Sequence, residues 1–385
     1  MTPGKKRVKP ITASNELRVQ IPLPPVAYYV TAHGYGHGVR SCDIIRALNN
    51  SAPHLPVHIV SDLPESFFTN RLASAANSCH AGSFDIGMVQ VDSIRVDVDA
   101  TLGRVENLYS NRNALVRQQE EFLRTGGFGL VVTDIPAIPL ESAARAGVPA
   151  IAVGNFSWDW IYSAFVTRDS RWDKAVRGFV EGYERADLLL RLPFYGDMRA
   201  FRKVEDLPLV ASPGVPRRRE IAGLTGCPMD TRWILLSFTT LEWDRAAIES
   251  VSRLSGFSFI TVLPLEWKRK NFYSVDRDSI PFADVVASVD AVLSKPGFGI
   301  VSECIVNEKP LVYADRSDFL EYGPLLEGIR KYLRNVHIPA DKLYRGDLHD
   351  ALDQIEQAAA PSYKLGGGGD SRAARRLLDF LGAGS

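Results

Sequence analysis

Residues 26–40 read Val26-Ala-Tyr-Tyr-Val-Thr-Ala-His-Gly-Tyr-Gly-His-Gly-Val-Arg40, and this stretch decides the fold. Its first half is a short apolar run between prolines and glycines, which is typical of a strand buried on both faces. From Gly38 to Asn49 apolar residues recur at helical spacing, and Val57–Ser61 is the next apolar run. Strand, helix and strand at this spacing predict a βαβ unit with a parallel sheet and a right-handed crossover.

The α/β pattern continues along the chain and restarts after one interruption. Later strands are predicted at Leu130–Thr133, Pro149–Val153, Ala186–Arg191, Trp233–Ser237, Phe259–Leu263, Ala291–Ser294 and Leu311–Tyr313. The interruption is Ala211-Ser-Pro-Gly-Val-Pro216, and 385 residues exceed what one ordinary core supports. The predicted organisation is a flexible leader, two Rossmann-like domains and a glycine hinge with a final helix, over residues 1–24, 25–212, 213–365 and 366–385.

The composition narrows the class of protein. Lys+Arg and Asp+Glu both total 45, so no overall field favours nucleic acid or an acidic membrane surface. No apolar run approaches the ~20 residues of a membrane span, and the N-terminus lacks the apolar core of a signal peptide. The four cysteines are scattered without a Cys-x-x-Cys pair, which suits a reducing compartment. We therefore expect a cytoplasmic protein.

The turn at residues 33–38 is the first candidate wall of a ligand site. Its three glycines, Gly36 among them, let a ligand approach the backbone, and the following helix presents unpaired N–H groups. His37 is a candidate general base near neutral pH, with His33 and Arg40 close by in the sequence. The simpler alternative is that the glycines only permit a tight turn that the histidines cap.

Two other interpretations of this turn fit its spacing poorly. A dinucleotide fingerprint needs its third glycine one residue later than Gly38, where Val39 stands. Asp62 could still act as the ribose-binding acid, so a dehydrogenase is weakened but stays open. A zinc site at His33 and His37 needs a third ligand, and the glycines between them disfavour it.

A second candidate wall is Lys295-Pro-Gly-Phe-Gly-Ile-Val-Ser-Glu303. Here a predicted strand ends, a glycine-rich turn follows and a helix begins beside Lys295. Backbone N–H groups together with one cation predict a diphosphate site. Glu303 could accept hydrogen bonds from a ribose diol, although a solvated helix residue is the alternative. Farther on, Asp315, Asp318 and Glu321 could bind sugar hydroxyls or belong to a polar loop.

Two further segments have competing interpretations. The aromatic run Asn155-Phe-Ser-Trp-Asp-Trp-Ile-Tyr162 could stack on a sugar or an apolar acceptor, or pack the core. Asp97-Val-Asp99 matches a metal-binding Asp-x-Asp, but its alternation from Ile94 predicts a strand with solvated acids. We therefore predict no metal site.

Five motifs carry a resemblance to a known family. They are Tyr28-Tyr-Val-Thr-Ala-His-Gly-Tyr-Gly-His-Gly-Val-Arg40, Asn155-Phe-Ser-Trp-Asp-Trp-Ile-Tyr162, Arg191-Leu-Pro193, Lys295-Pro-Gly-Phe-Gly-Ile-Val-Ser-Glu303 and Phe319-Leu-Glu321. Over roughly residues 26–380 the sequence resembles the N-terminal glycosyltransferase-like region of plant L-arabinokinases. It is more distantly similar to the peptidoglycan N-acetylglucosaminyltransferases. The resemblance implies a GT-B fold, in which two Rossmann-like domains face each other across a cleft. The sugar-kinase domain of plant arabinokinases has no counterpart up to Ser385.

The resemblance implies a role for each motif. It makes the first Rossmann-like domain the acceptor side and the second the nucleotide-sugar side. His37 matches the catalytic histidine, Glu303 the ribose-binding acid and Glu321 the residue that reads the donor sugar. The expected donor-binding residues are Lys295, Gly297, Phe298, Gly299, Glu303, Glu321, Gly36 and Thr239. The expected acceptor-side residues are His33, Arg40, Asp134, Asn155, Trp158 and Asp159. One departure is Ser237-Phe-Thr-Thr240, which stands where such enzymes have a glycine-rich turn.

The implied function is transfer of a hexosyl or pentosyl group from a nucleotide diphosphate donor, a UDP-sugar, to an acceptor hydroxyl. Inversion without a metal or other cofactor is expected. The acceptor would be a small molecule, a lipid or a glycan, with no nucleic acid involved. Two alternatives stay open: a non-catalytic module that binds a sugar nucleotide, and an epimerase or hydrolase of UDP-sugars on the same fold.

Overall fold

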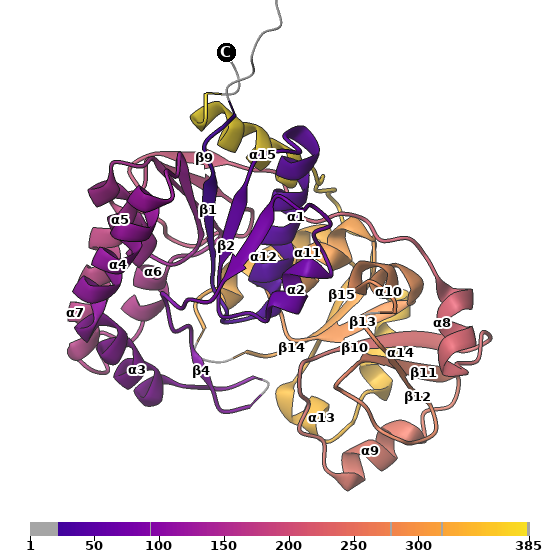
Figure 1. Ribbon diagram of the computed structural model, residues 1–385. Helices are drawn as coiled ribbons and strands as arrows, with labels where there is room; N and C mark the ends of the chain where they lie inside the picture. The colour runs from indigo at the N-terminus through magenta and orange to yellow at the C-terminus, as the bar shows by residue number, and fades with distance from the viewer. Residues whose placement is uncertain (1–21, 93, 278, 317–318, 383–385) are drawn as a thin grey trace, which may run out of the picture.

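The structure is a computed structural model that describes residues 22–92, 94–277, 279–316 and 319–382. Most of the predicted leader, residues 1–21, and the candidate residue Asp318 lie outside the described residues. Two parallel sheets with helices on both faces form the described structure (Figure 1). The predicted α/β class with two Rossmann-like parallel sheets is confirmed.

The first sheet has seven strands in the order β3-β2-β1-β6-β7-β8-β9, all paired in parallel. These strands are β1 (Val26–Val30), β2 (Val57–Val60), β3 (Asn77–His80), β6 (Leu130–Asp134), β7 (Ala150–Gly154), β8 (Leu188–Arg191) and β9 (Val204–Asp206). Their helices are α1 (Tyr35–Ser51), α2 (Glu65–Thr69), α3 (Val98–Ser110), α4 (Arg112–Thr125), α5 (Ile138–Ala146), α6 (Trp158–Ser163) and α7 (Arg171–Tyr183). The central strands β1, β6 and β7 are buried along their whole length, as their apolar runs predict.

The second sheet has six parallel strands in the order β12-β11-β10-β13-β14-β15. They are β10 (Arg232–Ser237), β11 (Phe257–Val262), β12 (Phe272–Val275), β13 (Ala291–Ser294), β14 (Leu311–Ala314) and β15 (Asn335–Ile338). The helices after β9 are α8 (Arg218–Thr225), α9 (Arg245–Ser252), α10 (Phe282–Ser288), α11 (Phe298–Val306), α12 (Tyr322–Tyr332), α13 (Ala340–Tyr344), α14 (His349–Gln357) and α15 (Gly369–Phe380). Two described strands, β4 (Val89–Gln90) and β5 (Val96–Asp97), form a separate antiparallel pair.

The acidic pair at residues 97–99 does not lie on one strand, so that prediction is wrong. Strand β5 ends at Asp97 and helix α3 begins at Val98. The Asp97 carboxylate accepts a hydrogen bond from the Ala100 N–H at 2.8 Å, which caps the helix. Capping of this kind satisfies an otherwise unpaired N–H group, and it outweighs the local alternation of apolar and polar residues.

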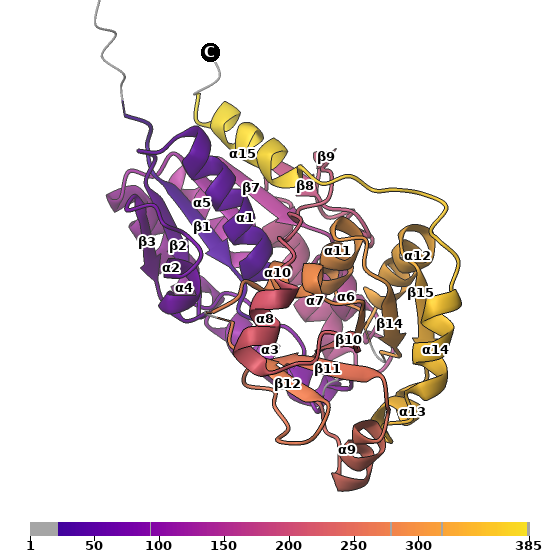
Figure 2. The same cartoon turned by 90° about the vertical axis from the view of Figure 1, so that its right-hand side faces the viewer.

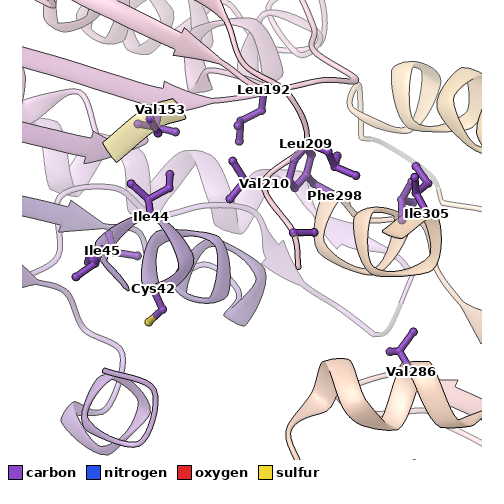
Figure 3. Close-up of a cluster of buried hydrophobic side chains, with 14 of the residues drawn as sticks. Cys42, Ile44, Ile45, Val153, Leu192, Leu209, Val210, Val286, Phe298 and Ile305 are labelled. Atoms are coloured by element: carbon purple, nitrogen blue, oxygen red, sulfur yellow. The ribbon is translucent and has the colours of Figure 1, made fainter. Parts of the chain in front are cut away.

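The last helix returns to the first sheet. Helix α15 lies beside α1 in both views (Figures 1 and 2), and its Leu377 is buried in the same apolar cluster as Ile44 and Leu48 of α1. The same cluster extends to the second sheet through Leu209 and through Phe298, the first residue of α11, both of which are labelled in Figure 3. One continuous core therefore joins the two sheets.

The chain crosses between the two sheets twice, and the two crossings touch. The first crossing follows β9, and the second precedes α15. The N–H of Leu209 donates to the carbonyl of Gly366 at 3.3 Å, and the N–H of Gly369 donates to the carbonyl of Leu209 at 3.1 Å. Only glycine fits at position 369, because a Cβ there would lie 2.2 Å from the Pro208 carbonyl oxygen. The two crossings therefore run side by side. In the part of the chain that the structure describes, no helix has the length and apolarity to cross a membrane.

Candidate active site between the two sheets

A cavity of about 710 Å³ lies between the two sheets, at the carboxyl ends of β1, β10 and β13. Ligands of open α/β sheets bind at these ends, and the volume falls in the range of small-molecule sites. Its walls include, from the first sheet's side, His33, Gly36, His37, Arg40, Gln90 and Phe156, and, from the second, Thr239, Lys295, Gly297, Phe298, Gly299, Arg316, Phe319 and Glu321.

Two helix starts face each other in this cavity. Gly34 caps α1 and Gly297 caps α11, both in extended conformation and neither with a side-chain hydrogen bond to the helix. The two turns approach closely, since a Cβ on Gly299 would lie 3.5 Å from the Gly36 Cα. Free N–H groups at both helix starts favour an anion or a developing negative charge between them.

His37 is oriented by a buried carboxylate. Its Nδ1 lies 2.8 Å from Asp134 Oδ1, at the end of β6, and Asp134 has no exposed surface. Burial raises the pKa of Asp134, but the charges of Arg40 and His37 outweigh it and hold the pKa below its usual value. An ionised carboxylate only accepts hydrogen bonds, so Asp134 favours the tautomer of His37 with a proton on Nδ1, whereas Arg40 Nη2, a donor 2.9 Å from the same nitrogen, favours the other tautomer. In the neutral tautomer that donates to Asp134, Nε2 keeps its lone pair.

Arg40 shares the same carboxylate. Its Nε donates to Asp134 Oδ2 at 2.6 Å and its Nη2 to Asp134 Oδ1 at 2.5 Å. Its Nη1 donates to Asn155 Oδ1 at 2.9 Å, and its guanidinium lies 5.0 Å from the centre of the Phe298 ring. A bidentate pair of this kind fixes the carboxylate plane, which in turn fixes His37.

Asn155 and Asp134 do not line the cavity. Both are fully buried, and the Asn155 amide contacts Arg40 on one side and Glu321 on the other. Its Nδ2 donates to Glu321 Oε1 at 2.7 Å. Glu321 itself lines the cavity with 5% of its surface exposed. Both residues expected on the acceptor side therefore orient charged neighbours of the cavity.

The predicted acceptor contacts of Trp158 and Asp159 are not supported. Trp158 has no exposed surface and its indole N–H donates to Asp85 at 2.8 Å, so its ring packs in the core of the first sheet. Asp159 is also buried and does not line the cavity. From this aromatic segment Phe156 reaches the cavity, where its ring meets the edge of His37.

His33 lines the cavity as a neutral imidazole. Its ring packs edge-on against Trp158 and directly over Gly87, where a Cβ would lie 2.0 Å from His33 Nδ1. Burial lowers the pKa of His33 to about 3, and the charges of His37, Arg316 and Lys295 add to the effect. His33 can therefore exchange hydrogen bonds with a ligand without adding a positive charge.

Two cations stand beside the start of α11. Lys295 donates to Gln90 Oε1 at 3.3 Å, and burial, followed by the charge of Arg316, lowers its pKa to about 8. Arg316 donates to the Pro296 carbonyl at 3.3 Å and stacks on Phe319 at 3.6 Å. Among the described residues, no carboxylate forms an ion pair with either cation.

Sequence reasoning missed Arg316. It stands in Asp315-Arg-Ser-Asp318, which drew attention to the carboxylates. Asp315 instead accepts hydrogen bonds from His337 and from the Ala340 N–H. The signal that was available is a basic residue two positions after the end of a parallel strand, where ligand-binding side chains gather.

Glu303 lies in a neighbouring pocket of about 590 Å³, one turn farther along α1 and α11. Asp43, Arg277 and Phe282 line the same pocket. The hydrogen bond to its side chain in the structure comes from Asn307 Nδ2 at 3.4 Å. Burial raises the pKa of Glu303 to about 8, and the charges of Asp43 and Asp284 contribute. Glu303 is therefore not in the same cavity as Gly297 and Gly299.

Thr239 lies where the sequence departs from the glycine-rich pattern. It is exposed, follows the end of β10 and lines the cavity opposite the helix of His37. Across the described residues, no three His, Cys, Asp or Glu side chains form a group suited to a metal ion.

Solved structures of glycosyltransferases share this architecture over most of the chain. The calicheamicin glycosyltransferase CalG4 is 16% identical with a TM-score of 0.57, and the alignment covers 94% of both chains. UGT2 of Phytolacca americana, complexed with UDP-2-fluoro-glucose and pterostilbene, is 12% identical with a TM-score of 0.57, over 94% of this chain and 95% of that one. UGT89C1 of Arabidopsis thaliana, complexed with UDP-L-rhamnose, is 14% identical with a TM-score of 0.56, over 94% and 100%.

The protein therefore has the GT-B fold of glycosyltransferases, as the sequence predicts. Among individual proteins, it is similar to L-arabinokinase of Arabidopsis thaliana, with 31% identity over 361 residues. That match covers 92% of this chain and 34% of the relative, so the chain spans about a third of that protein's length. The predicted resemblance is confirmed. No protein-family model matches the chain.

Proposed function

We propose that the protein transfers a sugar from a nucleotide diphosphate donor, a UDP-sugar, to an acceptor hydroxyl. The observation that carries this proposal is the His37–Asp134 pair, 2.8 Å apart, because His37 lies on the wall of a cavity that the start of α11 also lines. A base and an anion-binding helix start on opposite walls are what sugar transfer from a diphosphate requires. The UDP-sugar complexes of the structural neighbours support this donor class.

His37 would act as the base. Nε2 takes the proton of the acceptor hydroxyl while the acceptor oxygen forms a bond to the anomeric carbon of the donor. The bond from that carbon to the diphosphate oxygen breaks, and the diphosphate leaves with the electron pair. Asp134 stabilises the imidazolium that forms. One displacement of this kind inverts the anomeric configuration.

The departing diphosphate would lie at Gly297, Phe298 and Gly299. Their backbone N–H groups, together with Lys295 and Arg316, supply positive charge where negative charge develops. The proposal needs no metal, because these groups can neutralise the leaving group. Glu303 in the neighbouring pocket would hold the ribose, and Glu321 the donor sugar.

The acceptor would enter on the side of His37. His33 and Phe156 line this part of the cavity, one polar and neutral, the other apolar. The lining suits the hydroxyl group of a small molecule, a lipid or a glycan.

A panel of nucleotide sugars and acceptors tests the proposal through release of the nucleotide diphosphate. His37→Ala should lower turnover about 10²–10⁴-fold, which is the usual contribution of a positioned base. His349→Ala is the matched control, since this histidine is exposed and pairs with Asp353. If no donor is consumed with any acceptor, or if both variants behave like the wild type, the proposal fails.

One observation favours a second candidate, a module that binds a sugar nucleotide without transferring it. The turn after β10 contains Thr239 and Thr240 in place of glycines, so the backbone cannot approach a phosphate as closely there. Tight binding of UDP in calorimetry without turnover in any pairing would support this module. Conversion of the donor alone, or its hydrolysis by water, would indicate an epimerase or a hydrolase.

A further inference from the structure

Four buried side chains form one hydrogen-bonded chain from the first sheet to the second. The chain runs from Asp134 through Arg40 and Asn155 to Glu321, with donor–acceptor distances between 2.5 and 2.9 Å. Their exposed fractions are 0, 3, 0 and 5%. Buried polar groups cost free energy unless each is paired, so a connected set of this size is costly to interrupt.

The direction of each hydrogen bond is fixed by chemistry. Arg40 can only donate, and the Glu321 carboxylate, when ionised, can only accept. An amide between them must turn its oxygen to Arg40 and its nitrogen to Glu321, as Asn155 does. A carboxylate at position 155 would have no donor for Glu321.

The last link of this chain joins the two domains. Asn155 directly follows β7 of the first sheet, and Glu321 directly precedes α12 beside the second. The Asn155–Glu321 bond therefore exists only while the two sheets are closed on each other. Opening would leave Asn155 Nδ2 and Glu321 without this partner, whereas the Arg40–Asp134 pair lies wholly on the first side.

We propose that Asn155 is a positioning residue that couples closure of the two domains to the orientation of His37. In the closed form, Asn155 Oδ1 accepts a hydrogen bond from Nη1 of Arg40. This contact orients the guanidinium so that Nε and Nη2 donate to Asp134. Asp134 then holds Nδ1 of His37. The catalytic part of this inference rests on the proposed function, but the closure part does not.

The same contact places the donor-side carboxylate. Glu321 lines the cavity where the donor sugar would lie, and its Oε1 is held by Asn155. When the Asn155 bond is lost, Arg40 is free to turn, and its Nη2 already lies 2.9 Å from His37 Nδ1. A donor at Nδ1 favours the tautomer in which Nδ1 accepts and Nε2 carries the proton, and in that tautomer His37 cannot act as the base. The base and Glu321 are thus assembled together by closure.

An exchange of hydrogen-bond polarity tests the coupling. N155D keeps an acceptor for Arg40 but places two carboxylates against each other at Glu321. E321Q keeps an acceptor for Asn155. In the double variant N155D/E321Q, the amide introduced at position 321 donates to the carboxylate introduced at position 155, which restores both the total charge and the bond.

Closure is measured without substrate, as the radius of gyration in small-angle scattering and as the distance between spin labels on the two domains. N155D should shift the population toward longer distances, and the double variant should return to the distribution of E321Q. In turnover, N155D should lower kcat at least about tenfold with a smaller change in the donor KM, because geometry in the closed complex is lost.

E321A provides a second route should N155D fold poorly, since it removes the same bond from the partner on the second sheet's side and should open the domains similarly. An N155D distribution identical to the wild type, or a double variant no more closed than N155D, overturns the inference. If N155D, E321Q and the double variant show the expected distance distributions but the wild type transfers no sugar, the proposed function is contradicted and the closure inference stands.

Discussion

At the scale of single residues, Glu303 makes stability depend on pH. Burial raises its pKa from 4.5 to about 8, with the charges of Asp43 and Asp284 adding to the effect. The folded protein therefore keeps a proton that the unfolded chain releases above pH ~4.5. A raised pKa contributes stability that is fully present below the unfolded value and is lost as pH rises through the folded one.

We expect E303Q to remove this contribution. The free energy of unfolding of the wild type, relative to that of E303Q, should fall between about pH 5 and pH 8 and then level off. Urea titrations of both proteins at matched pH values measure the difference, in which other titrating groups cancel. Parallel stability curves would show that Glu303 does not hold a proton in the folded state.

Residue types and spacing were enough to predict two turns that the structure brings to one cavity. His37, Lys295, Gly297 and Phe298 all line one cavity. Spacing could not show which residues near those turns line the cavity and which are buried in the protein core. Trp158 lies three residues after Asn155, and both are fully buried in different surroundings, because β7 ends just before them and the chain then bends into α6.

At the scale of elements, α15 stabilises the first sheet although it belongs to the end of the chain. Leu377 is fully buried against α1. L377A should lower the free energy of unfolding by about 2–5 kcal/mol, since a buried leucine loses its burial and leaves a cavity. L224A is the control, because Leu224 on α8 is 62% exposed and should change stability by less than about 0.5 kcal/mol. Equal effects of the two variants in urea titrations would contradict this packing role.

Local pattern explains which elements form, but only partly how they pair. The βαβ spacing predicts parallel strands, and the sheets follow it. The strand predicted up to Asp99 ends instead at Asp97, because a cap is decided by the three residues that follow it. The return of α15 to α1 was not predictable from local pattern, because an amphipathic helix shows which of its faces is buried but not which sheet covers that face.

At the scale of the whole molecule, Phe194 also connects the two sides, through the Phe298 ring that lines the cavity. It follows β8, and its ring packs near Phe298 and Tyr332. Gly328 in α12 makes room for it, because a Cβ there would lie 2.4 Å from the ring. G328A should displace Phe194 and separate the domains, seen as a larger radius of gyration in solution with unchanged helix content.

Gly323 provides the matched control, since it lies in the same helix and a Cβ there meets nothing within 4 Å. G323A should keep the wild-type radius and gain a little stability from the better helix propensity of alanine. If G328A and G323A have the same radius of gyration, Phe194 does not hold the domains together.

The paired crossings at Leu209 and Gly366–Gly369 set how the two halves can move. The two crossing segments are joined by backbone hydrogen bonds, so they act as one paired connection between the halves. Two crossings that are bonded to each other restrict the relative movement of the two halves more than one crossing would. When the two halves close, the paired crossings favour the same two contacts each time, Asn155 with Glu321 and Gly36 with Gly299. The backbone pairing of the two crossings thus helps to fix how the two halves meet at the candidate site before any substrate binds.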